Sequence, residues 1–222
     1  MAKIAVLLVD DHKLVRTGLK FILHDTPDII VVGEASTGEE ALESARALKP
    51  DVVIMDVSMP GIGGLEATRK LAMGLPDARV IVLSVHTAEP YPMRLLEAGA
   101  SGYLTKDCAP DEIVKAIRRV RAGERYITAD IAHQLALNAV SHNTASPFDQ
   151  LSPREMQVTL MVTGGHSLQA ISEKLHLSPK TVSTYRSRLF EKLGVSNDVE
   201  LTRLALRYGV IEERSGESPV AR

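Results

Sequence analysis

Residues 4–12 read IAVLLVDDH, an uninterrupted apolar run that ends abruptly at two aspartates. A short run of this kind, without polar alternation, is typical of a strand that is covered on both faces of a sheet. It is too short for the core of a signal peptide or for a membrane-spanning helix. The stretch therefore predicts a buried strand with acidic side chains at its carboxyl end.

Further segments of the same kind follow, separated by stretches with helical spacing. The predicted strands are 4–8, 29–33, 51–56, 79–84 and a weaker 102–105. The predicted helices are 13–24, 38–48, 64–73, 89–98 and 111–122. Five β-α repeats predict an α/β fold: a five-stranded, doubly wound parallel sheet of the flavodoxin-like kind, with helices on both faces.

The strand pattern disappears after Leu151, and short helices replace it. Ser152-Pro153 and Ser178-Pro179 each place a proline at the first position of a predicted helix. Two more helices are expected at 167–175 and 198–207. Four short helices predict a second, smaller all-α domain.

We divide the chain into four parts by these patterns: a first domain at 1–125, a linker at 126–147, a helical domain at 148–212 and a disordered tail at 213–222. The first domain has 16 basic and 18 acidic residues, whereas residues 151–209 have 8 basic and 5 acidic. The excess of basic residues in the second half favours an anionic partner for that half. Cys108 is the only cysteine, so no intrachain disulfide can form, and we expect a cytoplasmic protein without a membrane partner.

Polar and charged residues follow the predicted strands at one edge of the sheet. They are Asp10, Asp11, Asp56, Ser84 and Lys106. The carboxyl ends of parallel strands meet at one edge, so these side chains should converge. Neighbouring carboxylates repel one another unless a lysine or a divalent cation such as Mg²⁺ compensates their charge. An aspartate in such surroundings can act as a nucleophile toward phosphorus.

The segments IAVLLVDDH, MDVSMPGIGG, VLSVH and GYLTKD resemble the receiver domain of response regulators over 4–122. The resemblance implies that Asp56 accepts a phosphoryl group from a sensor histidine kinase or from its phosphotransfer domain. It also implies a Mg²⁺ site formed by Asp10, Asp11, Asp56 and the backbone carbonyl of Ser58. By the same resemblance, Ser84 and Lys106 contact the phosphoryl oxygens and Tyr103 is the aromatic switch residue.

The predicted helix 179–193 has two different faces when its residues are placed at about 100° per step. Val182, Tyr185, Leu189 and Leu193 share the face that should pack inward. Small polar and basic residues on the other face suit a helix that reads the major groove of DNA, although an ordinary solvated face has the same pattern. The predicted DNA contacts are Lys180, Thr181, Ser183, Thr184, Ser187, Arg188 and Lys192. Arg186 lies near the packed face, so backbone or structural contacts are expected from it.

Residues 148–212 resemble the LuxR-type helix-turn-helix, through LSPREMQVTLMVTGG, AISEKLHLSPKTVSTYRSRLFEKLGV and ELTRLA. The resemblance implies that 179–193 is the recognition helix and that the fourth helix makes a dimer contact. The residues in that helical stripe are Leu201, Leu204, Ala205 and Tyr208, and the alternative is that they belong to the core.

Together the two halves resemble the NarL/FixJ class of response regulators, and in finer detail its GacA/UvrY branch. The class implies a transcription regulator that binds double-stranded DNA as a homodimer when phosphorylated, and not an enzyme. Two other classes of protein share part of this pattern. A phosphatase with an aspartate nucleophile needs a second aspartate where Ser58 stands. A LuxR regulator that senses an autoinducer needs an apolar cavity in place of the acidic edge.

Overall fold

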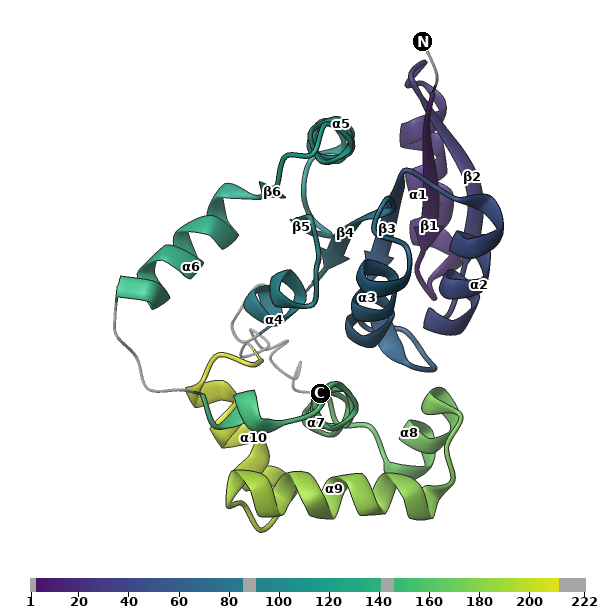
Figure 1. Ribbon diagram of the computed structural model, residues 1–222. Coiled ribbons are helices and arrows are strands. Elements are labelled where there is room, and N and C mark those ends of the chain that lie inside the picture. Colours follow the sequence, from purple (N-terminus) through teal and green to yellow (C-terminus); the bar gives the residue numbers. More distant parts are fainter. Residues whose placement is uncertain (1–2, 86–90, 141–145, 212–222) are drawn as a thin grey trace, which may run out of the picture.

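The computed structural model describes residues 3–85, 91–140 and 146–211 (Figure 1). The first part of the chain forms one parallel sheet with the strand order β2-β1-β3-β4-β5-β6. The strands are β1 (Ile4–Val9), β2 (Ile29–Ala35), β3 (Val52–Asp56), β4 (Arg79–Ser84), β5 (Gly102–Thr105) and β6 (Tyr126–Ile127). Their helices are α1 (Lys13–His24), α2 (Gly38–Leu48), α3 (Gly63–Gly74), α4 (Tyr91–Glu97), α5 (Pro110–Arg121) and α6 (Ala129–Val140). The predicted α/β fold with helices on both faces is confirmed.

The sheet has six strands, so the prediction of five is wrong. Gly102 pairs with Tyr126 and Tyr103 pairs with Ile127, which extends the sheet beyond β5. The N–H of Thr128 also donates to the carbonyl of Tyr103 at 3.2 Å. A strand of two residues is too short to produce an alternating or apolar run in the sequence. Residues 126–140 of the predicted linker therefore form β6 and α6, while 141–145 and the predicted tail lie outside the described residues.

Side chains of β1 alternate between two apolar cores, one on each face of the sheet. Val6 and Leu8 pack in the core that includes residues of α1 and α5. Leu7 and Val9 pack in the core that includes residues of α2 and α3. Because helices cover both faces of the sheet, each of these side chains is packed in one core or the other. This explains why the strand has no polar residue before Asp10.

Residues 147–211 form the helical part of the chain, in which a short 3-10 helix, η1 (Pro147–Gln150), precedes four α-helices. These are α7 (Pro153–Thr163), α8 (Leu168–Leu175), α9 (Pro179–Leu193) and α10 (Asp198–Arg207), close to the predicted positions. Ser152 and Glu155 form a capping box at the start of α7. Among the described residues, no helix is long and apolar enough to cross a membrane.

The helical part lies against α3 and α4 of the first part; in Figure 1 it is drawn below these two helices. Buried Tyr91 and Leu95 belong to the same apolar cluster as Phe148 and Met156. The Arg94 guanidinium adds three hydrogen bonds, to the carbonyl oxygens of 148 and 149 at 2.7 Å and of 151 at 3.0 Å. The two parts are therefore joined by both apolar packing and hydrogen bonds.

Candidate functional site

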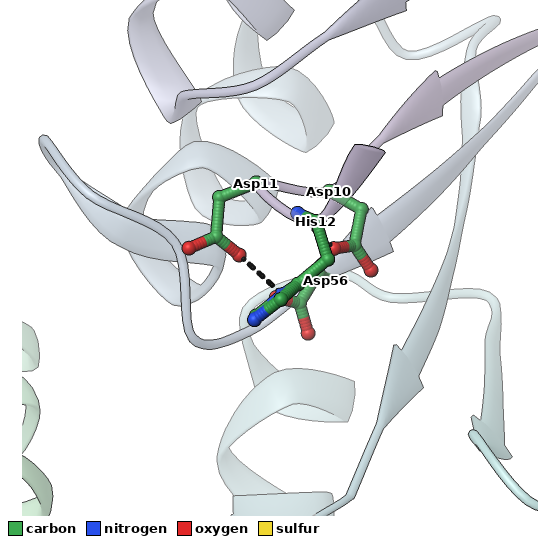
Figure 2. A group of neighbouring side chains, drawn as sticks. All are labelled: Asp10, Asp11, His12 and Asp56. Atoms are coloured by element: carbon green, nitrogen blue, oxygen red, sulfur yellow. Dashed lines mark hydrogen bonds and ion pairs between the residues drawn. The ribbon is translucent and has the colours of Figure 1, made fainter. Parts of the chain in front are cut away.

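The acidic side chains meet at the carboxyl ends of β1 and β3, as the sequence predicts. Oxygen atoms of Asp10, Asp11 and Asp56 and a ring nitrogen of His12 all lie within 4.8 Å of one another (Figure 2). The close approach of α3 to this edge depends on Gly64. A Cβ at this position would lie 2.0 Å from the carbonyl oxygen of Asp56, so any side chain here would displace the end of β3.

Lys106 supplies a positive charge beside the carboxylates. Its Nζ lies 2.7 Å from Oδ2 of Asp10 and 3.1 Å from Oδ1 of Asp56. Burial raises the pKa of Asp56, and the charges of Asp10 and Asp11 raise it further against the opposing effect of Lys106. Burial alone would lower the pKa of Lys106, but the carboxylates of Asp56 and Asp10 outweigh it and the pKa is raised. One lysine therefore leaves the three carboxylates short of positive charge.

The remaining carboxylate oxygens fit a hard divalent cation. Asp56 is only 3% exposed, and its Oδ2 has no hydrogen-bond partner among the described residues. A buried carboxylate oxygen without a partner is costly, and a cation would satisfy it. Asp10 and Asp11 offer further carboxylate oxygens, and oxygen ligands are those that Mg²⁺ prefers.

His12 is a member of this group that the sequence reasoning missed. Its Nδ1 lies 2.9 Å from Oδ1 of Asp11 and 3.3 Å from Oδ1 of Asp10. Figure 2 shows the ring beside the carboxylates of Asp11 and Asp56. The only signal in the sequence is that His12 directly follows the aspartate pair. Its side chain is 62% exposed, so only its contact with the two aspartates distinguishes it from any other residue before α1.

The other predicted residues of this site lie around the acidic group. Ser84 ends β4 and Ser58 lies in the loop after β3; Ser84 is fully buried and Ser58 is partly exposed. Tyr103 is fully buried in β5, in the same apolar cluster as Tyr91, Leu95 and Phe148. This cluster connects the interior of the sheet with the helical part of the chain.

The faces of α9 divide as predicted. Val182, Leu189 and Leu193 are buried, and Tyr185 is partly buried. The polar residues on the other face are exposed: Lys180, Ser183, Thr184, Ser187 and Arg188. Thr181 is partly buried, and its hydroxyl lies 2.8 Å from that of Ser178, the residue that caps the helix. The outer face of α9 is therefore not covered by the first part of the chain.

Lys192 differs from Lys180 and Arg188 of the same helix, because it forms an ion pair within the chain. Its Nζ lies 2.6 Å from Oε2 of Glu155, which is buried, and 3.2 Å from the carbonyl of Gln150. Burial raises the pKa of Glu155, but the hydrogen bonds from Lys192 and Ser152 outweigh it and the pKa is lowered. The structure thus gives Lys192 an ion pair inside the helical part, although its side chain is still 38% exposed, and its proposed contact with DNA stays a prediction.

Arg186 makes the structural contact that its position predicts. Its Nε lies 2.8 Å from Oδ1 of Asp198, and its guanidinium lies 4.7 Å from the ring centre of Phe190. The side chain therefore ties α9 to the start of α10.

The predicted dimer stripe on α10 is largely core, which corrects that prediction for two of its members. Leu201 and Ala205 are 0% exposed, so a second chain cannot contact them in this conformation. Tyr208 packs edge-on against Phe148, with 6.2 Å between ring centres, and Leu204 packs on the same cluster. A stripe at helical spacing cannot by itself distinguish a dimer surface from a core face.

Comparison with known proteins agrees with both parts of the chain. Residues 6–118 match the response regulator receiver domain, and residues 149–205 match the bacterial regulatory proteins of the luxR family. The chain is 56% identical to Response regulator UvrY of Escherichia coli strain K12 over 208 residues, which are 93% of this chain and 95% of that protein. It is 55% identical to Response regulator GacA of Pseudomonas aeruginosa over 213 residues, which are 96% of this chain and 100% of that protein.

Among solved structures, the RcsB response regulator of Salmonella typhimurium is similar, with a TM-score of 0.69 and 27% identity over 91% of this chain and 96% of that one. An RcsB–DNA complex has a TM-score of 0.58 at 27% identity, over 91% of this chain and 97% of that one. The family matches and the high identity to UvrY and GacA agree with the acidic edge and the exposed helix. The chain therefore belongs to the two-component response regulators that join a receiver domain to a LuxR-type DNA-binding domain.

Proposed function

We propose that Asp56 accepts a phosphoryl group from a sensor histidine kinase or from its phosphotransfer domain. The observation that carries this proposal is the state of the Asp56 carboxylate. One oxygen lies 3.1 Å from the Lys106 ammonium, and the other is buried without a hydrogen-bond partner among the described residues. The carboxylate is thus oriented by one ammonium group and has no second partner among the described residues, so it can hold Mg²⁺ with one oxygen and attack phosphorus with the other.

In the transfer, an Asp56 oxygen attacks phosphorus and the bond from phosphorus to the donor imidazole nitrogen breaks. An acyl phosphate forms on Asp56, and the imidazole leaves with its electron pair. The Lys106 ammonium offsets negative charge on the phosphoryl oxygens. Mg²⁺, when bound, would neutralise the same oxygens, held by Asp10, Asp11, Asp56 and the backbone carbonyl of Ser58.

The response to phosphorylation is proposed to pass through Ser84 and Tyr103. The Ser84 hydroxyl contacts a phosphoryl oxygen, and Tyr103 adjusts its packing in the cluster that it shares with Phe148. Phe148 belongs to η1, at the start of the helical part. A change in the packing of Tyr103 is therefore transmitted to the DNA-binding domain.

The surface proposed to receive the donor protein is the outer face of α1. Leu14 and Phe21 are 84% and 74% exposed, although both are large and apolar. They are seven residues apart, so they lie on one face of the helix. Gly18 lies between them, and a Cβ at this position would have no other heavy atom within 4 Å. This face begins directly after Asp11 and His12, where a helix of the donor protein could pack while its phosphohistidine reaches Asp56.

We further propose that α9 enters the major groove of double-stranded DNA and that the phosphorylated protein binds as a homodimer. One recognition helix reads too few base pairs to select a site in a genome, and two copies on a symmetric site solve this. The exposed basic and hydroxyl side chains of α9 support the groove contact. RcsB, a structural relative of this chain, has been solved as dimers bound to DNA, which supports the proposal of a DNA-bound homodimer.

The test is phosphorylation of the full chain by acetyl phosphate with Mg²⁺, followed by intact mass. Wild type should gain one phosphoryl group and Asp56→Asn none, because the amide nitrogen is not a nucleophile toward phosphorus. Asp77→Asn, at an exposed aspartate, is the matched control and should gain the group normally. Phosphorylation that persists in Asp56→Asn would show that another residue is the acceptor.

The consumption of acetyl phosphate in the same reaction tests whether the protein is an enzyme. A non-enzymatic receiver consumes about one acetyl phosphate per molecule before hydrolysis, whereas a phosphatase continues to turn over. Ser58 stands where an aspartate-nucleophile phosphatase has its general acid, which supports the first outcome. A cytoplasmic location follows from the proposed DNA partner.

A further inference from the structure

A cavity of about 150 Å³ lies between the receiver domain and the DNA-binding domain. Its receiver side comes from the loop after β3, the start of α3 and one residue of α4, and its other side comes from α7 and α8. Most of its lining is apolar: Met59, Ile62, Leu65, Tyr91, Leu160 and Met161. An apolar protein cavity of about 150 Å³ is large enough to hold one benzene ring.

Hydrogen bonds between the domains hold the walls of this cavity in place. Gln157, which lines it, donates from Nε2 to the carbonyl of Met59 at 2.9 Å. The Arg154 guanidinium donates across the boundary to the carbonyl of Gly61 and, within the DNA-binding domain, to that of Leu175 at 3.0 Å. The cavity is thus bounded by a hydrogen-bonded interface, and one of its walls begins at Val57, the residue after Asp56.

One residue of the lining, Lys174, carries a positive charge. Lys174 and His166 lie at the rim and are exposed, and the lining contains no aspartate or glutamate. Within the described part of the chain, the Lys174 ammonium has no ion-pair partner. A ligand that matches this site has an apolar body of ring size and one negative charge.

We propose that this cavity binds a small aromatic carboxylate, with the ring among the apolar side chains and the carboxylate at Lys174. The ligand would contact both domains, so its binding favours the arrangement of domains that forms the cavity. Such a molecule would act as a second input to the regulator, separate from phosphorylation. The site uses no side-chain atom of Asp56, so this proposal can be tested separately from the proposed phosphoryl transfer.

The probe is 4-fluorobenzoate, titrated into the full chain and followed by ¹⁹F NMR, with 4-fluorobenzyl alcohol as its neutral counterpart. We expect saturable binding of one 4-fluorobenzoate, about fivefold tighter than the alcohol. Lys174→Gln should weaken the carboxylate about fivefold and leave the alcohol unchanged. Lys115→Gln, at an exposed lysine of α5, is the matched control and should bind both like wild type.

Met161→Trp fills the cavity and should abolish binding of both probes; its unfolding temperature shows whether the domain stays folded. Asp56→Asn should bind the probes like wild type, which separates this site from the acceptor. Absence of saturable binding to wild type would overturn the proposal. Equal binding of the carboxylate to wild type and Lys174→Gln would also overturn it, because the ligand would then not be held by the rim charge.

Discussion

The acidic edge of the receiver domain and the outer face of α9 both carry charge, but they differ in where the opposite charge comes from. Asp10 and Asp56 are buried, and their nearest cation, Lys106, lies within the same site. Lys180 and Arg188 are exposed on α9, and within the described residues no ion pair engages them. The first region is partly neutralised by a lysine of its own chain, whereas the second is open to an opposite charge from outside the chain.

This difference predicts how each region responds to substitution. In a buried site each group compensates another, so loss of one member disables the whole group. On an exposed face the contacts are separate, so losses should be moderate and nearly additive. The following predictions test this contrast.

The largest effect is expected at the acidic edge, for Asp11→Ala. This substitution removes a carboxylate that is proposed to hold Mg²⁺. Loss of a direct ligand should cost at least the roughly 10–100-fold that loss of a supporting partner costs in metal affinity. Phosphorylation by acetyl phosphate should therefore be slow at millimolar Mg²⁺. Near-normal Mg²⁺ affinity in a titration of this variant would place the ion elsewhere.

A second prediction separates two lysines of the same helix. Lys192→Gln leaves buried Glu155 with the capping hydrogen bonds of Ser152 but without its cation. The free energy of unfolding should fall by about 1–2 kcal/mol, reduced by the partial exposure of the lysine. Lys180→Gln, at an exposed position, should unfold like wild type. Equal stability of the two variants in urea would show that the ion pair of Lys192 does not stabilise the fold.

The Glu155 pair also predicts a pH dependence. The pKa of Glu155 is lowered in the folded protein, so its ionised form stabilises the fold above the ordinary glutamate pKa. That contribution is lost as the pH falls through the lowered pKa. Wild type should therefore be more stable than Glu155→Gln at pH 7, and the difference should shrink below about pH 4.5. A difference that is constant from pH 7 to pH 3 would contradict the ion pair.

The smallest effects are expected from single positions on the outer face of α9. Lys180→Ala should weaken binding to all DNA sequences alike and lower the salt slope by about one unit. Ser187→Ala should instead cost roughly 1–3 kcal/mol on the preferred site and little on random DNA. Competition titrations at two salt concentrations measure both quantities. Equal losses on both kinds of DNA for Ser187→Ala would show that this hydroxyl does not reach a base edge.

The sequence was sufficient to predict a residue's position where that position follows from periodicity or motif spacing. The five strand runs placed Asp10, Asp56 and Lys106 at one edge, and the structure brings these three together. The helical spacing of α9 separated buried Leu189 from exposed Arg188.

The sequence was insufficient where the outcome depends on distant partners. Lys192 has the same place in the helical pattern as a DNA contact, and only the folded position of Glu155 shows that its ammonium also forms an ion pair within the chain. Leu201 and Ala205 have the pattern of an interface, and only packing against the rest of the chain shows that they are core. The hydrogen bonds that join the domains also cannot be predicted from the sequence, because their acceptors are backbone carbonyl oxygens, which every residue has.

That last property has an evolutionary consequence. Arg94, Arg154 and Gln157 each donate across the domain boundary to backbone carbonyl oxygens. Every residue type carries such an oxygen, so the acceptor segments can change their side chains without losing these bonds, provided that the backbone keeps its course. Recombination that joins a receiver to a different helical domain would therefore preserve the contact from Arg94 wherever the incoming turn has the same shape. Domain exchange is thus constrained by backbone geometry more than by matched pairs of side chains.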